Sequence, residues 1–256
     1  MKRAITGVGY AMGLTLLLAA NVSFANGNIE VVTSEGSVVV GDALGKTKKT
    51  VQAKSIVPVG NVLSTGSNAR AVVRVGSDGL LVVGKNSQVE IGKTKKGVSF
   101  FRQITGVIYY AINSVKDTRR TVEVRTATAT IGIRGTRFLV TDVEGRNEVG
   151  MRKGEVSVVS PEGEFEIHKQ AVQDEFEAFK AAGEAEVAKR AQEFEDYKAN
   201  VQKEFVEYKK EFTLAKDRMV SFDGKRVDDR PLSGETKNDM EALESYAEKW
   251  INEVRD

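Results

Sequence analysis

The sequence has no cysteine, and His168 is the single histidine among its 256 residues. Without cysteine, the chain can form no disulfide and can carry no lipid on an N-terminal cysteine. The usual zinc and copper sites need several cysteine or histidine ligands, so none can be built from this chain. We therefore expect no metal and no cofactor, and a fold that depends on an ordinary hydrophobic core.

The scarcity of catalytic residue types argues against an enzyme. A nucleophile activated by histidine would depend on His168, which lies where a predicted strand meets a predicted helix and is expected at the surface. Most acidic residues lie on predicted helices, where they form solvated faces and not a pair across a cleft. The segment 41–47 imitates a phosphate-binding loop but has one residue too few between its glycines. We predict a non-catalytic protein.

Long apolar runs are missing after the first 25 residues, which have the pattern of a secretory signal peptide. Lys2 and Arg3 precede an apolar run that ends at Ala20, and Ser23-Phe24-Ala25 supplies small residues for cleavage. A membrane anchor is the alternative, but glycine and threonine interrupt the run, whose strongly apolar part is shorter than the roughly 20 residues of a bilayer span. We expect cleavage after Ala25, a periplasmic or secreted protein, and no membrane span once the signal is removed.

The two halves of the predicted mature chain carry opposite charge. Residues 26–160 contain 20 lysines and arginines against 11 acidic residues, whereas residues 161–256 contain 16 against 25. Such an asymmetry bears on how a protein meets its partners and says little about its fold.

Residues 26–167 have the pattern of an all-β domain. Short valine-, leucine- and isoleucine-rich runs alternate with glycines, which is typical of a sandwich, a barrel or a solenoid. The most regular strand is predicted at 121–133, where apolar and small polar residues alternate. Past Gly135 the phase of the alternation changes, with Phe138 and Val140 apolar, so we predict a bend or a bulge at residues 132–135.

Several short motifs in this region resemble the signatures of the FecR-type domain family. Their order and spacing are specific, and the resemblance spans roughly residues 35–160. The motifs are VGNVLSTG at 59–66, ARA at 69–71, GKNSQV at 84–89, VRT at 124–126 and ATIGIRGT at 129–136.

The resemblance implies a β-rich, non-enzymatic module that is exposed in the periplasm. In the best-known members, such a domain relays a signal from an outer-membrane receptor to an anti-sigma domain in the cytoplasm. From this sequence we expect neither an anti-sigma region nor a membrane helix after the signal peptide. We therefore expect a stand-alone exported member that retains the binding role of the domain.

Residues 168–256 have a helical, coiled-coil-like pattern. The segment 168–220 has no proline, and Gly183 is its one interior glycine. Within it a glutamate-aromatic motif recurs at offsets of 18 and 11 residues, about five and three helical turns, so its aromatic residues fall on one face. That face comprises Phe176, Phe179, Phe194, Tyr197, Val201, Phe205, Tyr208 and Phe212.

A second, shorter helix is predicted at 234–254, with Ser233 as its N-cap, as an antiparallel partner of the long one. The long helix would extend about 75 Å, twice the roughly 35–40 Å diameter of the β domain. Its aromatic face therefore either packs within a helical hairpin, with a break near Gly183, or binds a second copy or a partner helix, or stays partly solvated. The predicted fold is mixed and segregated, with the β domain first and the helices after it.

Two groups of candidate binding residues stand out. Lys48, Lys49, Lys95 and Lys96 lie at predicted hairpin tips, where they either attract an anionic envelope polymer or protect strand edges from aggregation. In the segment Arg134-Gly135-Thr136, the arginine either pairs with a carboxylate or phosphate or holds neighbouring strands, while the glycine makes the bend. Nucleic acid is not expected, because no aromatic residue is interleaved with the lysines.

Three functions are compatible with these features. The leading one is a cell-envelope binding module whose β domain contacts a protein or an anionic polymer, with the helical tail used for assembly or partner binding. The second is a structural envelope protein that self-assembles through its helices. The third, an enzyme of unrecognised type, would require a deep apolar pocket with convergent polar groups.

Overall fold

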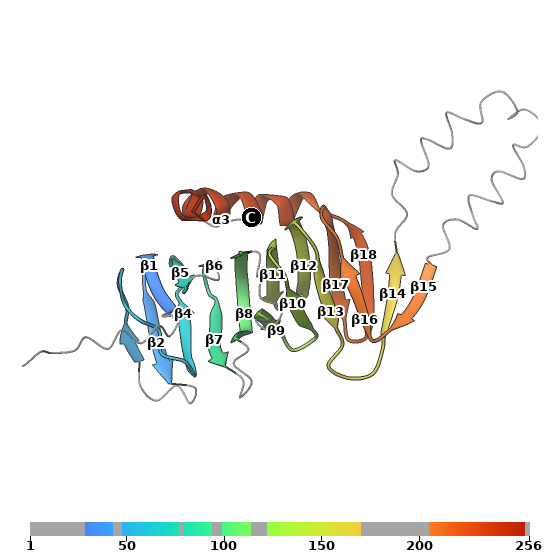
Figure 1. Cartoon of the computed structure of the whole chain (residues 1–256), viewed down its shortest axis with the longest axis horizontal. Coiled ribbons are helices and arrows are strands. Elements are labelled where there is room, and N and C mark those ends of the chain that lie inside the picture. Colours follow the sequence, from blue (N-terminus) through green and yellow to red (C-terminus); the bar gives the residue numbers. More distant parts are fainter. Residues whose placement is uncertain are drawn as a thin grey trace, which may run out of the picture.

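The computed structural model describes residues 29–42, 48–76, 79–93, 99–113, 122–169 and 205–253. These residues form eighteen strands and one helix, labelled α3 in Figure 1. The predicted signal peptide, at 1–25, lies outside the described residues. The same holds for most of the predicted long helix, at 170–204.

The strands form two sheets that share the long strand β8. Neighbouring strands are antiparallel, except that β8–β9 and β14–β18 are parallel. In order across it, sheet A contains β1 (Ile29–Glu35), β5 (Arg70–Val75), β6 (Gly79–Val83), the second half of β8 (Ser99–Ile112), β11 (Arg137–Val143), β12 (Arg146–Lys153), β17 (Arg218–Asp223), β18 (Arg226–Pro231), β14 (Phe165–Lys169) and β15 (Phe205–Lys209). Sheet B contains β3 (Lys48–Thr50), β2 (Val38–Asp42), β4 (Asn61–Thr65), β7 (Gln88–Lys93), the first half of β8, β9 (Val122–Arg125), β10 (Thr130–Ile133), β13 (Val156–Val159) and β16 (Glu211–Leu214).

The main hydrophobic core lies between the two sheets. Alternate side chains of both sheets meet there, and nearly all of them are fully buried. At its centre the ring of Tyr110 stacks on that of Phe138, with 5.0 Å between ring centroids. The predicted β character of the N-terminal part is confirmed. The predicted segregation of strands and helices is wrong, because the structure is mostly β and strands recur at 205–231 before the C-terminal helix.

Helix α3 (Gly234–Ile251) covers the outer face of sheet A (Figure 1). The central strands of sheet A are therefore buried on both faces, and all five residues of β6 are buried. This explains why their sequences lack polar alternation, because both faces exclude water. The predicted shorter helix is present, and the Ser233 hydroxyl caps it by accepting a hydrogen bond from the backbone N–H of Thr236. It packs on sheet A, and the described residues contain no second helix with which it could pair. The second core comprises Val72, Leu80, Val82, Tyr109, Ala111, Leu139, Met219, Leu232, Met240, Ala247 and Ile251.

Strand β8 bends at Gly106 as it passes from sheet B to sheet A. Gly106 has a φ of +100°, a conformation that suits glycine alone. Its carbonyl accepts a hydrogen bond from the buried amide of Gln103, which also donates to the carbonyl of Val140. The hydroxyl of Tyr110 donates to the side-chain oxygen Oε1 of Gln103. The bend is therefore held by a cluster of hydrogen-bonded polar groups inside the core.

The single strand predicted at 121–133 is wrong, because the chain reverses in its middle. β9 and β10 form an antiparallel hairpin in which Thr130 lies opposite Arg125. Thr126 makes the turn, since its hydroxyl accepts hydrogen bonds from the backbone N–H groups of Thr128 and Ala129. The predicted bend after this region is confirmed, with Gly135 at a φ of +79°.

The helix predicted at 168–220 is also wrong wherever the structure describes it. His168 and Lys169 end β14, and residues 205–231 contain the four strands β15 to β18. Pairing with β12, β13 and β14 favours the extended conformation over the local helical propensity. His168 is buried, not at the surface, and its Nε2 lies 2.8 Å from Oε1 of Glu166.

The predicted aromatic face is accordingly divided. Phe205 and Tyr208 lie on β15, and Phe212 lies on β16, where its ring packs edge-on against Phe165 at 5.7 Å. These residues line no helix. The remaining members, Phe176, Phe179, Phe194, Tyr197 and Val201, lie outside the described residues.

Candidate binding cleft

The first group of FecR-like motifs forms a buried clasp between two turns. The hydroxyl of Thr65 donates to the carbonyl of Gly84 at 2.6 Å and accepts from the backbone N–H of Ser87 at 2.9 Å. The N–H of Asn86 donates to the carbonyl of Gly66. These motif residues therefore hold the turns that follow β4 and β6 together, which is a structural role.

The second group ends at the bend that joins sheet B to sheet A. Arg134 is exposed there, whereas Thr136 is buried and its carbonyl accepts a hydrogen bond from the N–H of Ile112. Gly135 has a φ of +79°, which favours glycine, and its carbonyl oxygen would lie 3.0 Å from a Cβ at Gly154, leaving little room for a side chain there. The structure thus explains why Gly135 is needed, and the binding role of Arg134 remains a prediction.

A cleft of about 730 Å³ begins next to this bend. Its sheet wall comes from β11, β12 and the turn between β16 and β17, and its other wall is the second half of α3. The residues that line it are Arg137, Arg152, Lys153, Lys216, Asp217, Glu244, Ser245, Glu248, Ile251 and Asn252.

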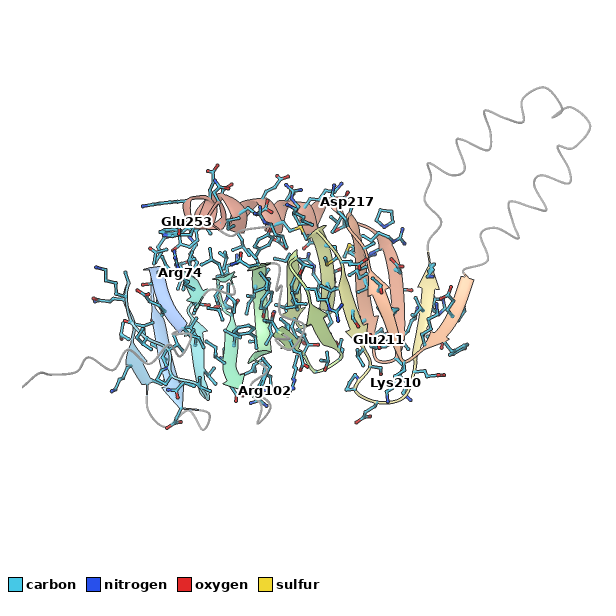
Figure 2. All side chains as sticks on the ribbon, in the orientation of Figure 1. Arg74, Arg102, Lys210, Glu211, Asp217 and Glu253 are labelled. Atoms are coloured by element: carbon cyan, nitrogen blue, oxygen red, sulfur yellow. The ribbon has the colours of Figure 1, made fainter. Side chains whose placement is uncertain are left out.

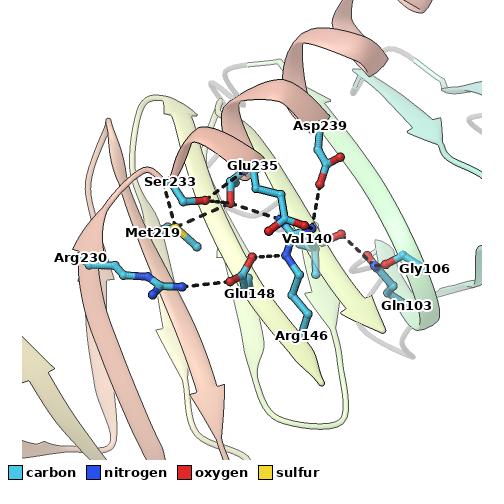
Figure 3. A network of polar contacts seen from close by, with 11 residues as sticks. Gln103, Gly106, Val140, Arg146, Glu148, Met219, Arg230, Ser233, Glu235 and Asp239 are labelled. Atoms are coloured by element: carbon cyan, nitrogen blue, oxygen red, sulfur yellow. Dashed lines mark hydrogen bonds and ion pairs between the residues drawn. The ribbon is translucent and has the colours of Figure 1, made fainter. Parts of the chain in front are cut away.

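The first half of α3 is held by an arginine on the sheet (Figure 3). The guanidinium of Arg146 donates to Glu148 at 2.7 Å, to Glu235 at 2.8 Å and to Asp239 at 3.0 Å. Arg230 also donates to Glu148. Partial burial lowers the pKa of Arg146, but its hydrogen bonds to Glu148 and Asp239 outweigh this and raise the pKa above its usual value. Arg146 therefore stays charged and fixes the start of the helix on β12.

The second half of α3 is held at Glu244 and Glu253. The buried hydroxyl of Tyr109 donates to Oε1 of Glu244 at 2.5 Å, and Nε of Arg152 lies 3.4 Å from the same oxygen. Burial, and then the hydrogen bond to this carboxylate, raise the pKa of Tyr109, so the phenol keeps its proton. Arg74 donates to Glu253 at 2.7 Å (Figure 2). The contacts of Glu244 with Tyr109 and Arg152 therefore hold the helix wall of the cleft on sheet A.

The sheet wall of the cleft is mainly cationic, although it also carries Asp217. Four cationic side chains come from the sheet wall, of which Lys153 and Lys216 are exposed to solvent. The acidic residues Glu244 and Glu248 come from the helix. Arg152 is engaged by Glu244, while the exposed ion pair of Lys216 with Asp217, at 3.4 Å, contributes little stability. The sheet wall can therefore bind carboxylate or phosphate groups.

Only part of the predicted site lies near this cleft. Arg134-Gly135-Thr136 immediately precedes Arg137, which lines it. Lys48 and Lys49 lie on β3, at the edge of sheet B, where β2, β4, β7, β8 and β9 separate them from β10. That is roughly 29 Å at about 4.8 Å per strand. Lys95 and Lys96 lie outside the described residues.

Sequence reasoning missed the cationic residues of the sheet wall. Arg137, Arg152, Lys153 and Lys216 are scattered over 80 positions, and each lies at the end of a strand or in a turn. Within the described part of the chain, no group of three or more histidine, aspartate or glutamate side chains is placed to hold a metal ion.

The fold and the cleft define a two-sheet β domain with a C-terminal helix on its outer face and an open, charged cleft beside that helix. Residues 61–157, from β4 to β13, match the family model of the FecR protein, a little over a third of the chain. The chain therefore carries a FecR domain, as the resemblance of its motifs predicts.

The chain is also similar to two crystal structures of a candidate anti-sigma factor from Parabacteroides distasonis, with 11% identity and a TM-score of 0.45. The similarity covers 69% of this chain and 62% of that protein. No curated protein sequence matches the chain significantly. Among the described residues, no helix is both long enough and apolar enough to span a bilayer.

Proposed function

We propose that the protein is a non-catalytic binding module of the cell envelope, whose FecR domain binds an anionic partner in the cleft beside α3. The observation that carries the proposal is the row of four cationic side chains on the sheet wall of that cleft. The partner is an acidic protein segment or an anionic envelope polymer. The envelope location follows from the signal-peptide pattern of residues 1–25.

The construction of the cleft suits recognition by charge. Arg137, Arg152 and Lys153 lie on strands β11 and β12, whose inner faces pack in the core, and Lys216 lies in the turn before β17. Surface charges of one sign accelerate the encounter with an oppositely charged partner and select it over others. The acidic residues of α3 on the opposite wall would repel an anion placed too close to the helix. An extended anionic chain that lies along β12 would contact the cationic residues of the sheet wall and stay away from the acidic residues of α3.

The proposal predicts a loss of binding when the exposed lysines of the cleft are reversed in charge. We expect Lys153→Glu with Lys216→Glu to weaken binding of poly-L-glutamate, lipopolysaccharide or peptidoglycan by roughly ten-fold or more, equivalent to about 1.4 kcal/mol. Titration at two salt concentrations measures this, because binding through charge weakens as salt is added.

Lys48→Glu with Lys49→Glu is the matched control. It makes the same change of net charge on β3, away from the cleft. The proposal requires the control to bind each of the three probes as the wild type does. An equal loss of probe binding in both double variants would show non-specific attraction. A loss of binding in the control alone would place the site at β3, on the edge of sheet B.

Self-association is the second candidate function, and one observation favours it. Self-association through a long helix cannot use Phe205, Tyr208 and Phe212, because these residues lie on strands. The strand β15 nevertheless exposes apolar side chains at the edge of sheet A.

A further inference from the structure

Strand β15 is the last strand of sheet A (Figure 1). It pairs with β14 on one side, and among the described residues no strand pairs with its other side. An edge of this kind presents unpaired backbone N–H and C=O groups and can accept a further strand.

Two large apolar side chains make this edge unusual. Val206 is 42% exposed and Tyr208 is 64% exposed, and both point to the outer face of sheet A. The edge of sheet B at β3 is different, because Lys48 and Lys49 protect it against pairing. On the opposite face of β15, Glu207 lies beside Lys209, with 2.5 Å between Oε2 and Nζ.

The sequence of β15 is complementary to itself in one antiparallel register. When two copies of the same strand pair in antiparallel fashion, the number of each residue and that of the residue opposite it add up to a constant. Side chains of the same face lie opposite each other only if this constant is even, so that one residue lies opposite its own copy. Centring the pair on Glu207 opposes two carboxylates, and centring it on Lys209 opposes two ammonium groups. Centring it on Tyr208 opposes Glu207 of each strand to Lys209 of the other and brings the two Tyr208 rings together.

We propose that a second copy of this chain pairs with β15 in the Tyr208-centred antiparallel register, so that sheet A continues across a two-fold axis. Such an axis repeats each contact, giving two Glu207–Lys209 pairs per dimer. A pairing of about five residues buries much less than a standard interface, so we expect weak association. The proposal is independent of the cleft, because β12 and β15 are separated by β17, β18 and β14.

Mixing two charge-reversal variants tests the register directly. Glu207→Lys opposes lysine to Lys209 of the other copy, and Lys209→Glu opposes glutamate to Glu207. Sedimentation equilibrium of the full chain is expected to show dimer formation in the wild type and at least ten-fold weaker association for each variant alone. The mixture of the two variants should recover the wild-type association, because each then meets its opposite charge.

Recovery in the mixture distinguishes pairing between chains from the ion pairs within one chain, which mixing does not restore. Tyr208→Lys, at a position that is 64% exposed, provides a second variant that leaves the core intact and is also expected to weaken association at least ten-fold. Lys237→Glu on the exposed face of α3 is the control and should associate as the wild type does. A wild type that is monomeric at all concentrations, or a mixture that stays as weak as its components, would overturn the proposal.

Discussion

Replacement of Gly106 by alanine is expected to lower the free energy of unfolding by roughly 3–5 kcal/mol. The φ of +100° at this position is strained for any residue with a Cβ. In addition, an added Cβ would overlap Cα and the side chain of Ser87, whose hydroxyl accepts a hydrogen bond from the N–H of Val107. The bend of β8 and the clasp between the FecR motifs would be lost together. Chemical denaturation measures the change.

Gly145 provides the matched control for this substitution. It also has a positive φ, +75°, but nothing lies within 4 Å of the position where a Cβ would be. Gly145→Ala should therefore cost only the backbone strain, about 1 kcal/mol. Equal effects of the two substitutions would show that crowding against Ser87 is not what fixes the bend.

Substitution of Met240 by aspartate is expected to release α3 from sheet A. The Met240 side chain is fully buried in the second core, so the change removes apolar contacts and places a carboxyl group among buried apolar side chains. The expected loss is roughly 4 kcal/mol or more. Hydrogen exchange should show lower protection of α3, and a dye for apolar surfaces should bind the uncovered face of sheet A.

Glu241→Ala, at the exposed neighbouring position, is the comparison. It should change stability by no more than about 0.5 kcal/mol. Unchanged protection of α3 in the Met240 variant would contradict the docking of the helix on sheet A.

The parts of the fold that the sequence predicts are those where one pattern has one physical solution. The valine-rich runs of β5 and β6 can only be buried strands, because they are too short for helices and are bounded by glycine. Ser233 and the apolar stripe after it predict α3, whose cap is observed. The change of phase past Gly135 predicts a bend at residues 132–135, where Gly135 has a positive φ.

The hairpin of β9 and β10 is not predicted because the regular alternation of residues 126–133 suggests one continuous strand. The core-facing residues are in fact Val122 and Val124 before the turn and Ile131 and Ile133 after it, so the alternation passes from even to odd positions at the turn. This change of phase is one missed signal, and Thr126 is another, since threonine followed by small residues can form such a turn through its hydroxyl.

The strands between residues 205 and 231 are mistaken for helix because charged and aromatic residues recur at intervals that suit both periods. Asp223-Gly224 is the missed signal, as this pair favours the tight hairpin that joins β17 to β18. The cleft cannot be predicted from the sequence at all. Its walls come from β11, β12, the turn after β16 and α3, which only the packing of the helix brings together.

Photo-cross-linking from Ser245 in the intact host cell tests the central claim most directly. Ser245 is exposed and lines the cleft, whereas Lys237 is exposed on α3 without lining it. A photo-reactive side chain at residue 245 is predicted to capture one defined partner, and Lys153→Glu with Lys216→Glu should abolish that product. Identical products from positions 237 and 245, or capture that survives the double charge reversal, would contradict a binding role for the cleft.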